Sequence, residues 1–210
     1  MLIEKYRLEV ADYGRKMLHY GLTMGTGGNI SARDPLTGLI AIKPSGIDYD
    51  KLTAEDITVI DLDGRVVEGA YKASSEWPMH TFMYRHNNKI GAVMHTHAPF
   101  ISAFCCANKD IPIVTQDLAE FASGWVRVAP FQLPGCVELG SGCVDYLGDS
   151  DLVLLQNHGS LAIGPSLYSA YAATVALERA CATYYYSLAM GQVTVVSPEA
   201  NRAIRLSGVA

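Results

Sequence analysis

Three histidines stand in two short motifs, each directly after an apolar run. His95 and His97 follow the run 90–94, and His158 follows the run 152–155. Because residues two apart on an extended chain point to the same side, His95 and His97 place two imidazoles on one face of a strand. His158 could complete a set of three from the end of a second strand. Three neutral imidazoles with one open or carboxylate position are typical of a catalytic zinc site, so the sequence predicts a metal site.

The other residues that often bind zinc do not offer a competing site. A structural zinc site more often uses cysteine, and the chain has no Cys-x-x-Cys motif. The remaining histidines, His19, His80 and His86, lie in or near helical patterns. For His19 and His86 an ordinary core or surface role is expected.

Three glycine- or serine-rich segments share a second chemistry, because each offers backbone N–H groups beside short hydroxyl or amide side chains. They are residues 25–29, 44–46 and 74–76. Glycine lets the backbone approach an anion closely, and Ser75 is expected at a helix N-terminus, where the helix dipole favours negative charge. Any one segment alone is more often an ordinary turn or helix cap. Together with the histidines, the three segments predict a phosphate site that needs no arginine.

Glu76 directly follows the two serines of the third segment. It could be no more than a favourable carboxylate in the first turn of a helix. It could also be a fourth metal ligand, or an acid/base group beside the metal.

Composition limits the classes of partner. The 210 residues are expected to form a single domain, 1–210, with a well-buried core. The net charge is −5 and no run of five basic residues occurs, so nucleic acid and anionic membranes are excluded as main partners. No apolar stretch reaches the ~18 residues that span a bilayer, and the charged N-terminal segment is not typical of a secretory signal. Five irregularly spaced cysteines indicate reduced thiols, so we expect a cytoplasmic protein.

Helical and strand patterns alternate along the chain. Helices are expected over 2–21, 75–87, 99–107 and 137–147, from 165 to about 190, as one turn at 53–56, and in the tail from 197. Strands are expected over 29–33, 39–42, 58–62, 65–68, 91–95, 126–129, 152–156 and 160–163. Interleaved helices and short, mostly non-alternating strands predict an α/β sandwich, with a central sheet covered by helices.

In their order and combination, the motifs resemble the class II aldolase/adducin-head family over essentially the whole chain. The resemblance is carried by the segments 25–31 (GTGGNIS), 43–46 (KPSG), 67–69 (VEG), 74–77 (SSEW), 95–97 (HTH) and 157–159 (NHG).

The resemblance implies an architecture and a set of ligands. It implies one class II aldolase/adducin-like domain over 1–210, a three-layer α/β/α sandwich with a mostly antiparallel central sheet. It also implies a homotetramer with fourfold symmetry and an active site at a subunit interface. The metal ligands implied are Glu76, His95, His97 and His158, and the groups implied to hold the substrate phosphate are Asn29, Ser45, Gly46, Ser74 and Ser75. The ion implied is Zn²⁺, although such ligands also suit Mn²⁺, Fe²⁺ or Co²⁺.

The activity implied is a zinc-dependent aldolase acting on a small phosphorylated sugar. Its substrate would be a ketose 1-phosphate of the L-fuculose 1-phosphate kind, cleaved to dihydroxyacetone phosphate and an aldehyde. The metal would act as a Lewis acid, and Glu76 would act as acid/base during cleavage of the C3–C4 bond.

The chain departs from the aldolase pattern in two places. The family aldolases carry a catalytic tyrosine shortly after an Ile-Pro pair, where this chain has Gln116. They carry a second tyrosine in the C-terminal tail, whereas residues 202–210 contain none. Glu120 lies where the related epimerases carry an acid, so it is a candidate catalytic residue that could act across the interface. The alternative role for Glu120 is a solvated surface charge.

Several other activities use the same scaffold. The nearest alternative is an L-ribulose-5-phosphate 4-epimerase, which shares the segment 43–50, although Glu76 and the short C-terminal region favour the aldolase. A dehydratase or decarboxylase of phosphorylated sugars or sugar acids also stays open, because such enzymes reuse this site, and the two missing tyrosines indicate a different substrate. A non-catalytic adducin-head-like interaction module is least favoured, since those heads have lost the metal ligands. A purely structural metal site is disfavoured by the neighbouring phosphate-binding segments.

Overall fold

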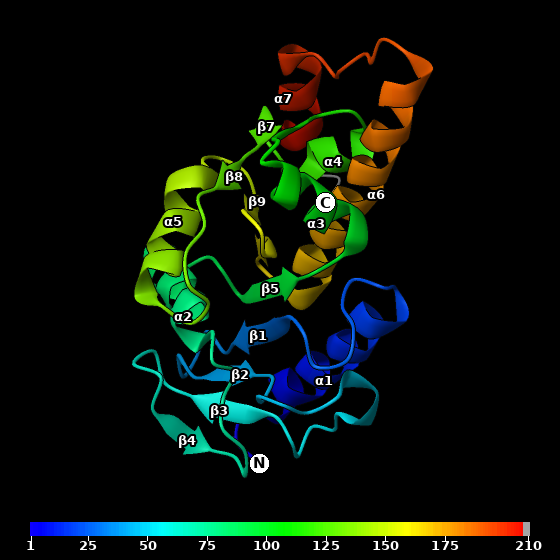
Figure 1. The fold of residues 1–210 in the computed structure, drawn as a ribbon. Helices are drawn as coiled ribbons and strands as arrows, with labels where there is room; N and C mark the ends of the chain where they lie inside the picture. The colour runs from blue at the N-terminus through cyan, green and yellow to red at the C-terminus, as the bar shows by residue number, and fades with distance from the viewer. Residues whose placement is uncertain (208–210) are drawn as a thin grey trace.

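An eight-stranded sheet forms the centre of the molecule (Figure 1). The computed structural model describes residues 1–207, and the strands of this sheet run in the order β4-β3-β2-β1-β5-β10-β9-β8. Their bounds are β1 Asn29–Arg33, β2 Ile40–Ile42, β3 Thr58–Ile60, β4 Val66–Glu68, β5 Ala92–Thr96, β8 Val128–Ala129, β9 Leu152–Leu155 and β10 Gly159–Gly164. All neighbours are antiparallel except β8 and β9, which are parallel. The strands β6 (Ile111–Pro112) and β7 (Trp125–Val126) pair separately.

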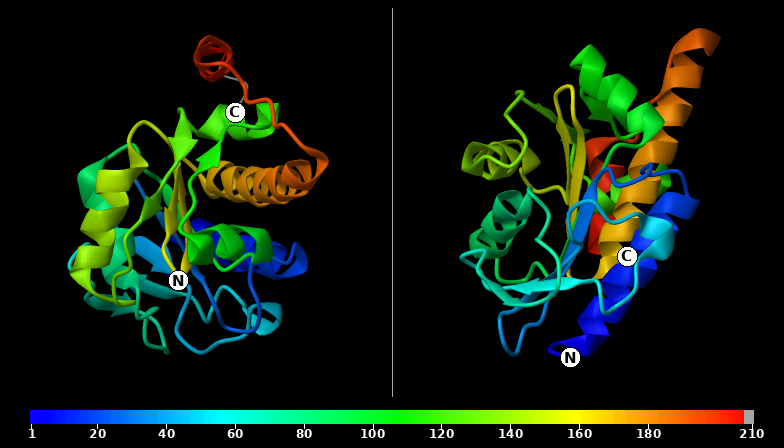
Figure 2. Two further views of the ribbon diagram at one scale, coloured as in Figure 1. Left: turned by 45° about the horizontal axis from the view of Figure 1, so that its top comes forward. Right: turned by 60° about the horizontal axis from the view of Figure 1, so that its bottom comes forward.

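Helices cover both faces of the sheet, which confirms the expected three-layer α/β/α sandwich (Figure 2). They are α1 Glu4–His19, α2 Trp77–His86, α3 Pro99–Ala107, α4 Gln116–Phe121, α5 Val137–Leu147, α6 Leu167–Met190 and α7 Pro198–Leu206, with a 3₁₀ turn η1 at Tyr49–Lys51. The pair α2 and α5 packs over one face, and α1, α3 and α6 cover the other.

The central strand β5 contributes to two separate hydrophobic cores. Successive side chains of a strand point to opposite faces, so Ala92 and Met94 enter the core under α1, α3 and α6, whereas Val93 enters the core under α2 and α5. Every residue of β5 is buried. Burial on both faces explains why this segment reads as a continuous apolar run rather than as an alternating one. By the same alternation, His95 belongs to the α2–α5 side.

The register of the central strands brings distant motifs together. Asn29 of β1 pairs with His95 of β5, and Ser160 of β10 pairs with Thr96 on the other side of β5. The glycine loop before β1 and the turn between β9 and β10 therefore lie at the end of β5, next to the His-Thr-His motif. Three segments therefore meet at the C-terminal end of β5: the glycine loop, the His-Thr-His motif and the turn that contains His158.

Two glycines make this close approach of backbones feasible. A Cβ at Gly28, which has a φ of +65°, would meet the carbonyl oxygen of His95 at 2.6 Å. A Cβ at Gly159 would meet the carbonyl oxygen of Thr96 at 2.1 Å. Any larger residue would push one of these segments away from β5.

Most expected elements are confirmed, two local expectations are wrong, and one helix was missed. The segment 53–56 is a turn and not a helix, because its backbone bonds run from Asp56 N–H to the Thr53 carbonyl and from Ile57 N–H to the Ala54 carbonyl, three residues back in each case. The expected strand 126–129 is interrupted at Arg127, where the chain leaves β7 and joins the main sheet as β8. The short helix α4 was not expected at all. Its polar first turn hides the pattern, although Thr115 caps it by accepting from Leu118 N–H.

Within residues 1–207, none of the helices combines the length and the apolar character needed to span a lipid bilayer. The expected single domain, 1–210, includes residues 208–210, which lie outside the described residues.

Replacing Gly159 by alanine is expected to destabilise the protein. The added methyl group collides with the Thr96 carbonyl, so the variant should lose roughly 1–3 kcal/mol of unfolding free energy. Gly142→Ala is the matched control, because Gly142 lies in α5 with open space around it and should gain about 0.5–1 kcal/mol. Urea unfolding of both variants measures the difference. A Gly159→Ala variant as stable as the native chain would contradict the proposed close approach.

Candidate metal centre and phosphate cavity

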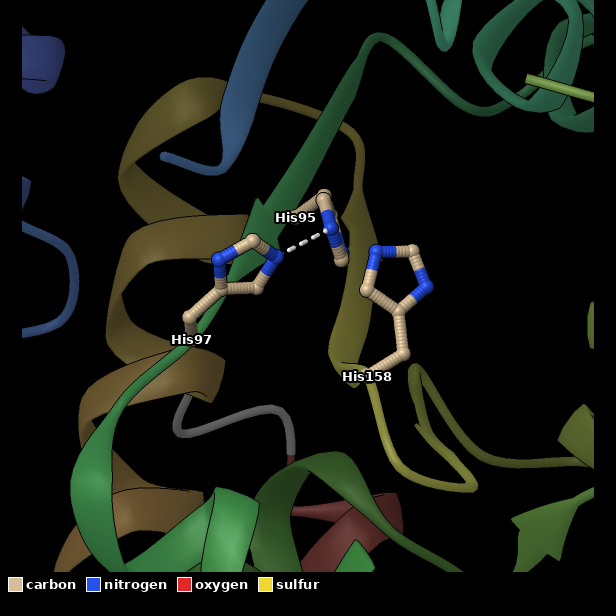
Figure 3. Close-up of side chains that lie close together, drawn as sticks. All are labelled: His95, His97 and His158. Atoms are coloured by element: carbon tan, nitrogen blue, oxygen red, sulfur yellow. Dashed lines mark hydrogen bonds between the residues drawn. The ribbon is translucent and has the colours of Figure 1, made fainter. Parts of the chain in front are cut away.

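The three predicted histidines converge at the end of β5 (Figure 3). Each offers a ring nitrogen, and these nitrogens lie within 4.8 Å of one another. The Nε2 atoms of His95 and His97 are 2.9 Å apart. The carboxylate of Glu76 reaches the same place, with Oε2 at 3.4 Å from Nε2 of His95 and Oε1 at 3.5 Å from Nε2 of His158. The structure therefore brings together all four predicted metal ligands.

The histidines are held as neutral imidazoles. Burial lowers the pKa of His95 well below its usual value and lowers the pKa of His97 to about 4. Burial also lowers the pKa of His158, against the opposing effect of the Glu76 carboxylate. The Nδ1–H of His95 donates to the Ser160 carbonyl at 2.9 Å, which leaves a lone pair on Nε2. Neutral rings with free lone pairs are the state that binds a metal ion.

The polar atoms of this cluster fit a divalent cation. Within residues 1–207, Oε1 of Glu76 and Nδ1 of His158 are buried without a hydrogen-bond partner. A buried carboxylate oxygen without a partner is costly unless a cation compensates it. Three imidazole nitrogens and one carboxylate also match the ligand set of a catalytic zinc ion. The donor set therefore suits the metal that the sequence predicts.

Neighbouring elements hold the two histidine segments in place. The turn with His158 is fastened to α3, because Asn157 N–H donates to the Cys105 carbonyl at 3.3 Å and the Cys105 thiol donates to the Gly159 carbonyl at 3.0 Å. The helix α3 begins two residues beyond His97. The Glu178 carboxylate on α6 accepts from the first N–H groups of α3, at 3.0 and 2.9 Å. The ends of both strands are thus anchored to the helical layer.

A cavity of about 450 Å³ opens beside the histidines. Its walls include all five residues predicted to hold phosphate, which are Asn29, Ser45, Gly46, Ser74 and Ser75. Glu76, His97 and His158 also line it, so the anion-binding groups and the metal ligands share one cavity. The helix α2 begins at this cavity, because its N-cap residue Glu76 lines the wall. Its first N–H groups and its helix dipole therefore favour binding of an anion there.

The cavity also contains a cation that the sequence analysis missed. Lys43 is 2% exposed, and its Nζ donates to the Thr26 carbonyl at 3.3 Å and lies 4.5 Å from the centre of the Tyr49 ring. Burial lowers the pKa of Lys43 to about 8, although Asp48 opposes the shift. In the sequence, Lys43 was marked only by its position before the predicted segment 44–46 and by its place in the family-like segment 43–46. A lysine expected on or near a strand has no periodicity that marks it as buried.

The structure does not place Glu120 or Gln116 in this cavity. Both lie on α4, and Glu120 lines a different hollow of about 370 Å³ between α4 and α6, together with Tyr20 and Tyr171. Within one chain, Glu120 and three of the predicted metal ligands therefore line different cavities.

Comparison with known proteins identifies the family. Residues 8–185 match the model of the Class II Aldolase and Adducin N-terminal domain, and the chain belongs to this family. It is 38% identical to a 5-deoxy-D-ribulose 1-phosphate aldolase of Bacillus thuringiensis serovar kurstaki, over 91% of this chain and 90% of that protein. It is 31% identical to an L-ribulose-5-phosphate 4-epimerase of Salmonella paratyphi C, over 84% and 82% of the two chains. The solved structure of an L-fuculose 1-phosphate aldolase superposes with a TM-score of 0.92 at 32% identity, covering 97% of this chain and 95% of that chain.

These similarities confirm the resemblance and the fold inferred from the sequence. The chain is an enzyme of the class II aldolase type, a family in which metal dependence is typical, and its histidine cluster provides a place for the ion.

Replacing His95 by alanine is expected to abolish stoichiometric metal binding while the protein stays folded. Loss of a ligand should weaken metal affinity by more than the roughly 10–100-fold that loss of an outer hydrogen-bond partner costs. Metal content by mass spectrometry and circular dichroism measure the two properties. His86→Ala is the control, because His86 is exposed at the far end of α2. Retention of one metal ion per chain by folded His95→Ala would show that the ligands are wrongly assigned.

Proposed function

We propose that this protein is a cytoplasmic, zinc-dependent aldolase that cleaves a short phosphorylated ketose to dihydroxyacetone phosphate and an aldehyde. The observation that supports the proposal is that one cavity holds both the histidine–Glu76 cluster and the anion-binding segments. In a ketose 1-phosphate the carbonyl group and the phosphate are only a few bonds apart. The carbonyl group could therefore lie at the histidine–Glu76 cluster while the phosphate lies at the anion-binding segments of the same cavity.

The two aldolase relatives narrow the substrate class. Their names describe 1-phosphates of ketoses that end in a methyl group, 5-deoxy-D-ribulose in one case and L-fuculose in the other. Cleavage between C3 and C4 of such substrates releases dihydroxyacetone phosphate and a small aldehyde, acetaldehyde or lactaldehyde. We therefore propose a deoxyketose 1-phosphate as the substrate.

In the proposed mechanism, the phosphate anchors the substrate. The predicted phosphate residues donate hydrogen bonds to it, and Lys43 supplies the positive charge. Anchoring fixes C3 and C4 beside the Glu76 carboxyl group, so that little orientational entropy remains to be lost during the reaction. A divalent cation held by His95, His97 and His158 supplies Lewis-acid stabilisation of the negative charge that develops on the substrate oxygens.

Two proton transfers accompany the cleavage. The C4 hydroxyl loses its proton while the C3–C4 bond breaks, and the electron pair of that bond stays at C3. The Glu76 carboxylate takes up a proton from solvent and delivers it to C3, and the group that accepted the C4 hydroxyl proton returns it to solvent. We assign the acceptor of the C4 hydroxyl proton to Glu120 of a neighbouring copy.

We propose a homotetramer with the active site at the subunit interface. Pro134 lines the cavity, and large apolar side chains beside it face solvent in the single chain, with Phe131 50%, Leu133 68% and Val137 59% exposed. An exposed apolar rim of this kind favours a protein interface. A neighbouring copy packed on this rim could bring its α4 toward the cavity.

The reaction is tested by assaying dihydroxyacetone phosphate release from L-fuculose 1-phosphate and 5-deoxy-D-ribulose 1-phosphate, with and without chelator. We expect release that stops with chelator, returns with Zn²⁺ and is absent in His95→Ala. An epimerase is the second candidate, because the Salmonella relative carries that name. Conversion of L-ribulose 5-phosphate to its C4 epimer, without release from either ketose 1-phosphate, would replace the aldolase proposal with the epimerase.

The phosphate role of Lys43 predicts a pH dependence. The pKa of Lys43 is about 8, so its ammonium group is charged below that pH and loses its proton as the pH rises through it. We expect kcat/KM for a phosphorylated substrate to decline above pH 8 in the native enzyme. Lys43→Met should raise KM by about tenfold or more at pH 7 and should remove that step from the profile.

Lys51→Met is the matched control for Lys43→Met, since Lys51 is an exposed lysine on η1. A Lys43→Met enzyme with native KM and an unchanged pH profile would contradict the phosphate role.

A further inference from the structure

A continuous line of buried polar side chains runs from Glu76 into the molecule, behind the metal ligands. It consists of Glu76, Asn29, His80, Ser31 and Tyr84, which are 6%, 4%, 0%, 0% and 1% exposed. None of the sequence motifs predicted this line.

Its geometry arises from two periodicities that face each other. Glu76, His80 and Tyr84 are four residues apart at the start of and along α2, so they lie on one face of the helix. Asn29 and Ser31 are two apart on β1, so they lie on one face of the strand. Side chains from α2 and from β1 alternate along the line, and each forms a hydrogen bond with the next.

Each contact in the line is a hydrogen bond. Tyr84 Oη and Ser31 Oγ are 2.7 Å apart, and Ser31 Oγ and His80 Nδ1 are also 2.7 Å apart. On the other side of the ring, Nε2 of His80 bonds Oδ1 of Asn29. Nδ2 of Asn29 then donates to Oε2 of Glu76 at 2.6 Å. Glu76 Oε2 is thus satisfied, whereas Oε1 is the oxygen without a hydrogen-bond partner within residues 1–207.

The donors in this line all point the same way. A carboxylate only accepts, so the Asn29 amide must present its NH₂ group to Glu76 and its carbonyl oxygen to His80. His80 must then carry its hydrogen on Nε2. Burial lowers the pKa of His80 to about 3, so the ring is neutral and has only this one N–H. Nδ1 therefore accepts from the Ser31 hydroxyl, and Ser31 accepts from the Tyr84 hydroxyl, whose pKa burial raises.

We propose that His80, oriented by Ser31 and Tyr84, is a positioning residue that locks the Asn29 amide and thereby aims the Glu76 carboxylate at the metal. With the amide locked, an N–H always faces Oε2, and Oε1 is left for the cation. If the amide turned over, its carbonyl oxygen would face the carboxylate and repel it. The inference rests on the proposed role of Glu76 as metal ligand and acid/base.

A purely structural network would behave differently from a positioning network. Loss of a buried hydrogen bond lowers stability in both cases. Only the positioning role requires the metal site itself to change in a variant that stays folded, because outer hydrogen-bond partners of ligands set ligand orientation and metal affinity.

The test uses full-length protein loaded with Co²⁺, whose visible absorption spectrum reports ligand geometry. The variants are His80→Leu, His80→Gln and Ser31→Ala, with His86→Leu as control on the exposed end of the same helix. Co²⁺ affinity by chelator competition, the absorption spectrum, kcat and KM for the ketose 1-phosphate, and the melting temperature are measured for each. We expect His80→Leu to lose roughly 10–100-fold in Co²⁺ affinity and in kcat, with an altered spectrum. KM should change by less than about threefold, because the other phosphate-binding groups stay in place.

The conservative variant His80→Gln tests whether a replacement N–H donor restores the metal site. The terminal amide of glutamine can place an N–H near the position of His80 Nε2–H, so His80→Gln should recover most of the spectrum and affinity. Ser31→Ala keeps the small core volume but removes the donor to Nδ1, which frees the ring to adopt its other tautomer. We expect an intermediate loss of affinity in Ser31→Ala.

The outcomes separate this inference from the proposed function. Folded His80→Leu with native Co²⁺ affinity and spectrum would overturn the positioning role. If His80→Leu does not fold, native affinity and spectrum in Ser31→Ala overturn it instead. If the native protein binds Co²⁺ but releases no dihydroxyacetone phosphate, the aldolase proposal fails, and the affinities and spectra still decide the role of His80.

Discussion

The antiparallel register of β1, β5 and β10 is the constraint on which the candidate site depends. It pairs Asn29 with His95 and Thr96 with Ser160, so three segments far apart in the sequence end at one place. A slip by one residue would turn His95 to the opposite face of the sheet and separate it from Glu76. The close backbone contacts at Gly28 and Gly159 maintain this register, because no other residue type fits there without displacing β5.

Burial lowers the pKa of basic groups in both halves of the cavity, but the resulting charges at neutral pH differ. At the metal ligands it keeps the imidazoles neutral, which makes their lone pairs available. At the phosphate segments it lowers the pKa of Lys43, yet leaves the group charged at neutral pH, where it can attract an anion. The Glu76 carboxylate lies between these halves and is fixed from behind by Asn29. A substrate with a carbonyl group near a phosphate would bridge the two environments.

The segments in which this chain differs from the family aldolases are α4 and the C-terminal tail. Within one chain, the helices α4 and α7 contact each other and Glu120 lies outside this cavity. Asn201 of α7 donates to the Ala119 and Ala122 carbonyls, and Arg205 donates to the carbonyls of Glu120 and Asp149. These bonds fasten α7 to the end of α4, which carries Glu120. A rigidly held α4 on the outside of the chain is suited to presenting its side chains to a neighbour. In the proposed tetramer, differences in this region would alter the aldehyde end of the substrate site, whereas the metal and phosphate residues lie on other elements.

Elements with local patterns could be predicted from the amino-acid sequence. The histidine spacing, the glycine segments and the capped helices depend on neighbours in the chain. The convergence of the three histidines, several residues of the cavity wall and most helices and strands could therefore be predicted. Which side chains become buried, and which meet across elements, depends on the packing of the whole chain. Lys43, directly after β2, becomes a buried cation only when the segment with Thr26 and the Tyr49 ring pack against it. His80 meets Asn29 only when α2 packs against β1. Such roles come from packing between distant segments, which no local spacing records.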